Sequence, residues 1–122
     1  RIGDATAAVT TLDVRGGISA GVQTKTGNYT MLASDFLINA NNTSGGAPDT
    51  ITMTLPSAAN AGQIVVVVKI NSGATHSITV ARAGADTING SASSQVITTQ
   101  YGRVTLVADG GTNWVTLGGV SL

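Results

Sequence analysis

The stretch Thr50-Ile51-Thr52-Met53-Thr54-Leu55 decides the fold. Hydroxyl-bearing and apolar side chains alternate in it without interruption, which is the period-2 pattern of a β-strand with one face in a core and the other toward water. We therefore expect Ile51, Met53 and Leu55 to be buried and the three threonines to face outward.

A nearly continuous run of Val and Ile follows in residues 64–70. It is too short and too rich in β-branched residues for a helix, so it predicts a central strand covered on both faces. Further strands are predicted at residues 28–32, 35–40, 77–81, 95–99, 103–108 and 113–117. Short strands at this spacing predict an all-β domain, either a β-sandwich or a jelly-roll-like fold.

Two connections between these strands have clear local signals. Asp109-Gly110-Gly111-Thr112 separates the last two strands, and because Asp and Gly tolerate the positive backbone angles of tight turns, it predicts an antiparallel hairpin. Residues 57–62 follow a proline, consist mainly of small side chains and end in a glycine, which predicts a single helical turn or an irregular loop.

The N-terminal part of the chain differs from the rest. Its apolar residues, including Leu12, Val14, Ile18 and Val22, are separated by polar residues and glycines and are too sparse to form a core of their own. We therefore predict an extended N-terminal shaft or connector in residues 1–24 and a β-sandwich module in residues 25–122. The connector needs a partner surface, either the main domain or sister chains.

The composition of the 122 residues excludes several classes of function. Six Lys and Arg balance six Asp and are scattered singly, so no basic patch for nucleic acid or an anionic membrane is present. The longest strictly apolar run, residues 64–68, is far too short to span a bilayer. With only 10% charged residues, the surface suits an assembly whose faces are largely occupied.

Several short elements together resemble a module of tailed-bacteriophage fibres. Ile2-Gly3-Asp4-Ala5-Thr6 and residues 11–19, TLDVRGGIS, are similar to the "IGT…LDVNGNI" element of phage tail fibres and related trimeric appendages, with Arg15 where that element has Asn. From residue 27 onward the order of elements is also similar: a Tyr-Thr opening, TITMTLP, "AG…VVVK", DTING and a closing VTLVADGGTNWV. The closing element of the family has one Gly where this chain has Gly110 and Gly111.

The resemblance implies a homotrimeric β structure around a threefold axis. It implies a structural role in a virion fibre, a tail fibre or appendage involved in host attachment, at the surface of a particle assembled in the cytoplasm of the host bacterium. The alternative it leaves open is a capsid decoration or head-fibre protein. The implied partners are other copies of the chain, other virion proteins and a glycan or protein of the host cell surface. Unpaired strand edges favour association independently, because closed symmetric assembly removes them.

No residue is predicted to be catalytic, to bind a cofactor or to hold a metal. Residues 17–21 match G-x-S-x-G, but a nucleophile elbow needs a strand that turns sharply into a helix, and no helical pattern follows. A hydrolase dependent on Ser19 is the competing enzyme hypothesis. A glycan-degrading spike has weak support, because the six acids are scattered and none of them is Glu.

The remaining candidates each have a structural interpretation that we favour. His76 is predicted to be a solvated loop residue, the alternative being one of three symmetry-related ligands at a threefold axis. Residues 86–90 are predicted to form a turn rather than a Ca²⁺ loop, because they lack further carboxylates. Trp114 is predicted to lie in the core. If Trp114 or Tyr101 instead lies on an exposed face, it becomes the first candidate for contact with a receptor glycan.

Overall fold

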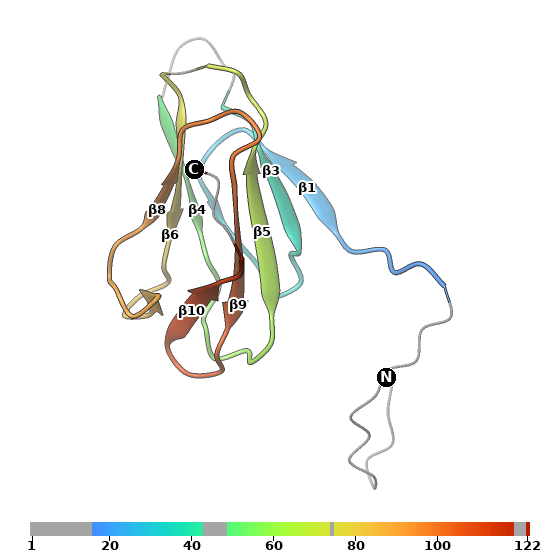
Figure 1. The fold of residues 1–122 in the computed structure, drawn as a ribbon, viewed down its shortest axis with the longest axis vertical. Helices are drawn as coiled ribbons and strands as arrows, with labels where there is room; N and C mark the ends of the chain where they lie inside the picture. Colours follow the sequence, from blue (N-terminus) through green and yellow to red (C-terminus); the bar gives the residue numbers. More distant parts are fainter. Residues whose placement is uncertain (1–15, 43–48, 74, 119–121) are drawn as a thin grey trace, which may run out of the picture.

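The computed structural model describes residues 16–42, 49–73, 75–118 and 122, and these residues form ten strands in two mixed sheets with no helix. Sheet A has the order β1 (Val22–Lys25), β3 (Leu37–Ala40), β5 (Ile64–Lys69), β9 (Arg103–Ala108), β10 (Asn113–Thr116) and β7 (Thr87–Ile88). Sheet B has the order β2 (Tyr29–Thr30), β4 (Thr50–Thr54), β6 (Ser77–Ala81) and β8 (Gln95–Ile97). Figure 1 shows the two sheets as two layers. The all-β prediction is confirmed, and the two layers are consistent with the predicted sandwich.

The chain alternates between the two sheets over its first six strands. As a result β1, β3 and β5 pair in parallel in sheet A, and β2, β4 and β6 pair in parallel in sheet B. Parallel neighbours need a crossover connection, and here each crossover includes a strand of the opposite sheet. Antiparallel pairing enters with β8 and β9, and β9 and β10 form the predicted hairpin.

One core lies between the sheets, and it contains the inward-facing residues of both. They include Ile38, Val67 and Leu106 from sheet A and Ile51, Ile78 and Ile97 from sheet B. The alternation predicted for residues 50–55 is confirmed, because Ile51, Met53 and Leu55 are buried and the threonines between them are not. The core therefore fixes which face of each strand points outward.

The long aliphatic strand β5 is central, as predicted, but only one of its faces is buried. Val65 and Val67 point into the core, whereas Val66 and Val68 are half-buried and Ile64 is exposed on the opposite face. Within the described residues that second face is only partly buried, so the expectation of a strand buried on both faces is wrong for the isolated chain.

The hairpin between β9 and β10 is fixed by Asp109 and Gly110. The carboxylate of Asp109 accepts hydrogen bonds from the backbone N–H groups of Gly111 and Asn113, at 2.8 and 3.1 Å. Gly110 has φ +88°, and a Cβ there would lie 2.7 Å from the Cβ of Ala61. The turn therefore needs glycine at this position both for its backbone conformation and for space. Residues 57–62, where a helical turn or a loop was expected, form turns.

Two short edge strands, β1 and β7, were not predicted from the sequence. The predicted boundary between residues 24 and 25 falls inside β1, which pairs with β3 over its whole length. Residues 16–21, which we call the connector, precede β1, form no strand and are all exposed. Figure 1 shows the connector running away from the two sheets. The first part of the predicted shaft, residues 1–15, lies outside the described residues.

Candidate functional site

The two aromatic residues named as receptor candidates lie in opposite environments. Trp114 is fully buried, and its indole N–H donates a hydrogen bond to the carbonyl of Pro56 at 3.2 Å. The prediction of Trp114 as a core residue is confirmed, and burial removes it from the surface. Tyr101 is 64% exposed and keeps its place as the candidate for contact.

The loop between β8 and β9 holds Tyr101 in an unusual conformation. Its φ is +59°, a left-handed backbone that bulky residues rarely adopt. The loop is tied to the end of β5, because the N–H of Tyr101 donates to the carbonyl of Lys69 at 2.7 Å and the N–H of Lys69 donates to the carbonyl of Gly102 at 3.0 Å. The neighbouring Gln100 amide donates to the carbonyl of Ile70 at 3.2 Å. Backbone contacts therefore present the exposed ring in a defined position.

Tyr101 lies at the end of the domain opposite the connector. The parallel strands β1, β3 and β5 run toward this end, where Lys25, Ala40 and Lys69 are register partners. The loops that meet there are residues 41–42, 70–73, 75–76 and 98–102, which we call the Tyr101 pole. The chain enters sheet A at Val22, the other end of β1.

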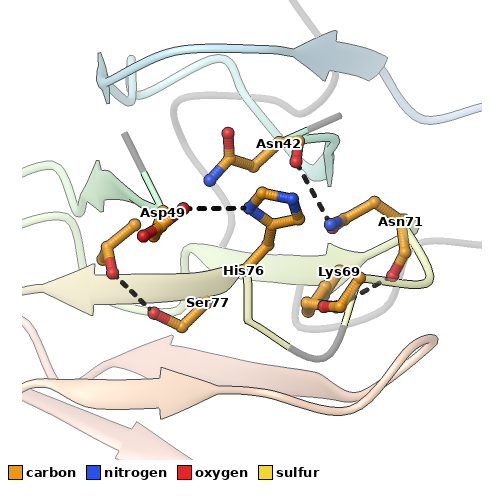
Figure 2. A network of polar contacts seen from close by, with 8 residues as sticks. Asn42, Asp49, Lys69, Asn71, His76 and Ser77 are labelled. Carbon is orange, nitrogen blue, oxygen red and sulfur yellow. Dashed lines mark hydrogen bonds and ion pairs between the residues drawn. The ribbon is translucent and has the colours of Figure 1, made fainter. Parts of the chain in front are cut away.

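A buried lysine organises the Tyr101 pole, and sequence reasoning missed it. The Nζ of Lys69 donates hydrogen bonds to the backbone carbonyls of Asn71 and Gly73, at 2.8 and 3.1 Å, and burial lowers its pKa (Figure 2). The Asn71 amide donates to the carbonyl of Asn42 at 3.2 Å, which joins the loop after β5 to the loop after β3. The sequence contained a signal for this burial, because Lys69 is separated from the inward-facing residues Val65 and Val67 by an even number of positions in the same strand.

His76 lies in a loop, as predicted, but its side chain is only 24% exposed rather than solvated. The ring packs against Gly73, where a Cβ would lie 2.2 Å from the ring carbon Cδ2. Its Nδ1 is 3.8 Å from a carboxylate oxygen of Asp49, as Figure 2 shows. The imidazole therefore occupies space that is free because residue 73 is glycine. The ring packs on the loop whose carbonyls accept hydrogen bonds from Lys69.

The structure does not bring together the residues considered for a hydrolase or for a Ca²⁺ site. Ser19 is in the exposed connector, whereas His76 precedes β6 at the Tyr101 pole. Asp86 accepts a hydrogen bond from the backbone N–H of Ala58 at 2.8 Å, and Asn89 bonds through its amide group to Thr116. The side-chain oxygens of the considered Ca²⁺ loop thus serve the turn and its neighbours.

A second polar cluster joins the first strands of the two sheets. The carboxylate of Asp35 accepts hydrogen bonds from the Gln23 amide at 2.5 Å, from the Tyr29 hydroxyl at 2.9 Å and from the backbone N–H of Leu32 at 2.8 Å. The ammonium of Lys25 lies 3.8 Å from the centre of the Tyr29 ring. The hydrogen bond to Asp35 is the main cause that raises the pKa of Tyr29. This cluster fixes β1 to β2 and therefore positions the connector.

Among residues 16–42, 49–73, 75–118 and 122, no group of three or more His or acidic side chains is placed to hold a metal ion. The same residues contain no helix long and apolar enough to cross a membrane. Comparison with known protein families finds no match, and comparison with curated proteins finds none either. Fold and local geometry therefore carry the functional argument.

Proposed function

We propose that this chain is a structural module of a tailed-bacteriophage virion fibre, a tail fibre or related appendage, that works as a homotrimer in host attachment. The fibre role follows from the sequence resemblance of residues 2–6, 11–19 and 27 onward, and the structural observation that supports self-association is the connector. All six of its residues are exposed, including the apolar Ile18 at 77%, and it leads into an edge strand whose first residue, Val22, is 59% exposed. Exposed apolar side chains and an unpaired strand edge become covered when sister chains pack against them.

The polarity of the domain supports a role in attachment. The connector and the Tyr101 pole lie at opposite ends of the parallel strands of sheet A. In a fibre whose shaft continues from the connector, the Tyr101 pole points away from the shaft. An exposed aromatic ring offers a flat apolar surface with a polar edge, which suits the face of a sugar ring. Tyr101 is the residue we assign to contact with a host glycan or protein.

Light scattering of the purified chain tests the assembly. The expected mass is three times the 12.1 kDa of one chain. A truncated chain that begins at Gly21 should form a weaker trimer, which dissociates into monomers at protein concentrations where the full chain is still trimeric. Gly21 is retained because its carbonyl accepts a hydrogen bond from the N–H of Leu37 at 3.0 Å. A monomer at every concentration, for both chains, would overturn the proposal.

Binding of the labelled chain to host cells and to empty capsids tests its place on the particle. A tail fibre or appendage should bind cells, and Tyr101→Ala should weaken that binding at least tenfold while the mass of the assembly stays the same. Binding to capsids alone would instead assign the chain to the shell as a head fibre.

A further inference from the structure

We infer that the outer face of sheet A is the surface through which copies of this chain contact one another. The outer face is formed by the side chains that point away from the core on β1, β3, β5, β9 and β10. This inference rests on the proposed self-association and adds to it the surface that copies share. It follows from a difference between the two sheets.

Two rows of the outer face of sheet A consist mainly of aliphatic side chains, and a third row, Thr24, Asn39, Val68 and Arg103, is mainly polar and lies toward the Tyr101 pole. The register places Val22, Leu37, Val66 and Thr105 in one row across four strands. A second row contains Ile64, Val107 and Val115. Between them these two rows hold six aliphatic side chains and one hydroxyl. Leu117, whose N–H donates to the carbonyl of Thr105, extends the first row.

The outer face of sheet B has the opposite character. Its central rows pair Thr50 with Ser77, Thr52 with Thr79 and Val96, and Thr54 with Ala81. Hydroxyl groups dominate this face, as expected of a sheet that meets water. Thr has a high β-propensity, like Val and Ile, so strand formation alone does not require aliphatic residues on the outside of sheet A. Their presence indicates a second surface to be buried.

The composition of β5 supports the same conclusion. Near-continuous Val and Ile runs are typical of strands that are covered on both faces. The run Ile64–Lys69 has that composition, yet Ile64 is exposed and Val66 and Val68 are only half-buried in the single chain.

The low charge of this face favours further copies of this chain as the occupant. Arg103, at the first residue of β9 and opposite Val68, is the one charged side chain among the described residues of this face, so two such faces meet without a cluster of like charges. Five strands about 4.8 Å apart, with about five residues each at about 3.3 Å per residue, give an area of roughly 400 Å². A stable interface needs about 800 Å² per partner, so the face requires a second contact. The connector continues directly from β1 and supplies it.

Matched substitutions on the two sheets test the inference. Val115 on sheet A and Val96 on sheet B are 38% and 43% exposed, so a lysine at either position reaches water in the monomer. Sedimentation equilibrium of the full chain should show that Val115→Lys weakens association at least tenfold and that Val96→Lys leaves it unchanged. Circular dichroism verifies that both variants fold, and Leu117→Lys replaces Val115→Lys if that variant does not.

Other outcomes would overturn either the assignment of the outer face of sheet A alone or the proposed function as well. Association that survives Val115→Lys and Leu117→Lys, or that is lost in Val96→Lys alone, would overturn the assignment of the face and leave the proposed function standing. A parent chain that remains a 12.1 kDa monomer at every concentration would overturn both.

Discussion

Replacing Gly110 by alanine should destabilise the domain through two separable effects. Gly110 has φ +88°, and an alanine in that left-handed conformation destabilises the folded state by about 1–2 kcal/mol. Alanine also lowers the conformational entropy of the unfolded chain, which offsets about 0.4–1 kcal/mol of that cost. The new Cβ would also lie 2.7 Å from the Cβ of Ala61, an overlap that costs about 1–3 kcal/mol to relieve. We expect Gly110→Ala to lower the free energy of unfolding by about 2–4 kcal/mol.

Two other glycines separate these effects. Gly62 has φ +78° with nothing within 4 Å of its Cβ position, so Gly62→Ala should show the backbone cost alone, about 1 kcal/mol. Gly111 lies in the same turn as Gly110, and its Cβ would meet only the Asp109 carboxylate at 3.4 Å. Gly111→Ala should therefore change the free energy of unfolding by less than about 0.5 kcal/mol.

Urea denaturation followed by far-ultraviolet circular dichroism measures these differences. All variants are compared at one protein concentration, because association stabilises the folded chain by mass action. Ala61→Gly in the Gly110→Ala background should recover the steric part, with a coupling energy of at least about 1 kcal/mol. Equal losses for Gly110→Ala and Gly62→Ala, with no coupling to residue 61, would contradict a steric contribution from Ala61.

Three further substitutions test the core, the buried lysine and the cluster around Asp35. Trp114→Phe removes the hydrogen bond to Pro56 and leaves a cavity, so the free energy of unfolding in urea should fall by about 2–3 kcal/mol, and a loss below about 0.5 kcal/mol would contradict the packing. Lys69→Met leaves two backbone carbonyls without their donor and should cost about 1–3 kcal/mol. Because burial lowers the pKa of Lys69 below 10.5, the unfolded chain binds more protons between the folded pKa and 10.5, so the parent should gain stability as pH rises through that window and Lys69→Met should not. The pKa of Tyr29 is raised above 10.0, so its contribution to stability is present below pH 10.0 and lost as pH rises through the folded pKa. Asp35→Asn should lower the midpoint of the phenol titration, read by absorbance in a Tyr101→Phe background, and an unchanged midpoint would contradict the role of Asp35.

The strands that were predicted correctly are those whose side chains alternate against the core. Residues 50–55 and 103–108 have a period of two, and burial follows that period in the structure. The hairpin between β9 and β10 was also predictable, because Asp109 and Gly110 provide its turn locally. In these segments the local pattern and the tertiary packing require the same conformation.

Other features depend on contacts that no local pattern reveals. The period-2 signal is the same for parallel and antiparallel strands, so the parallel pairing of β1, β3 and β5 could not be predicted. The edge strands β1 and β7 are short and contribute a single side chain, Ile88, to the core, and their pairing depends on the backbone of their neighbours. The left-handed conformation of Tyr101 is fixed by bonds to Lys69, which is distant in the sequence.

The sequence predicted only in part which residues lie on the surface. The run in residues 64–70 predicted a strand covered on both faces, and the structure finds one face covered. That difference is informative, because it locates the surface through which we propose that copies of the chain meet. The sequence predicted Trp114 to lie in the core but left both Trp114 and Tyr101 as candidates for receptor contact. Burial separates them.

Protection of a single cysteine from alkylation shows whether copies of the chain cover the outer face of sheet A. The chain contains no cysteine, and Val66 and Thr79 are half-buried on the outer faces of sheet A and sheet B, respectively. The account predicts that the Val66→Cys variant reacts with a maleimide progressively more slowly as protein concentration rises, while the Thr79→Cys variant reacts at a constant rate. Equal and concentration-independent rates for the two variants, in a preparation that light scattering finds associated, would contradict the claim that copies meet through the outer face of sheet A.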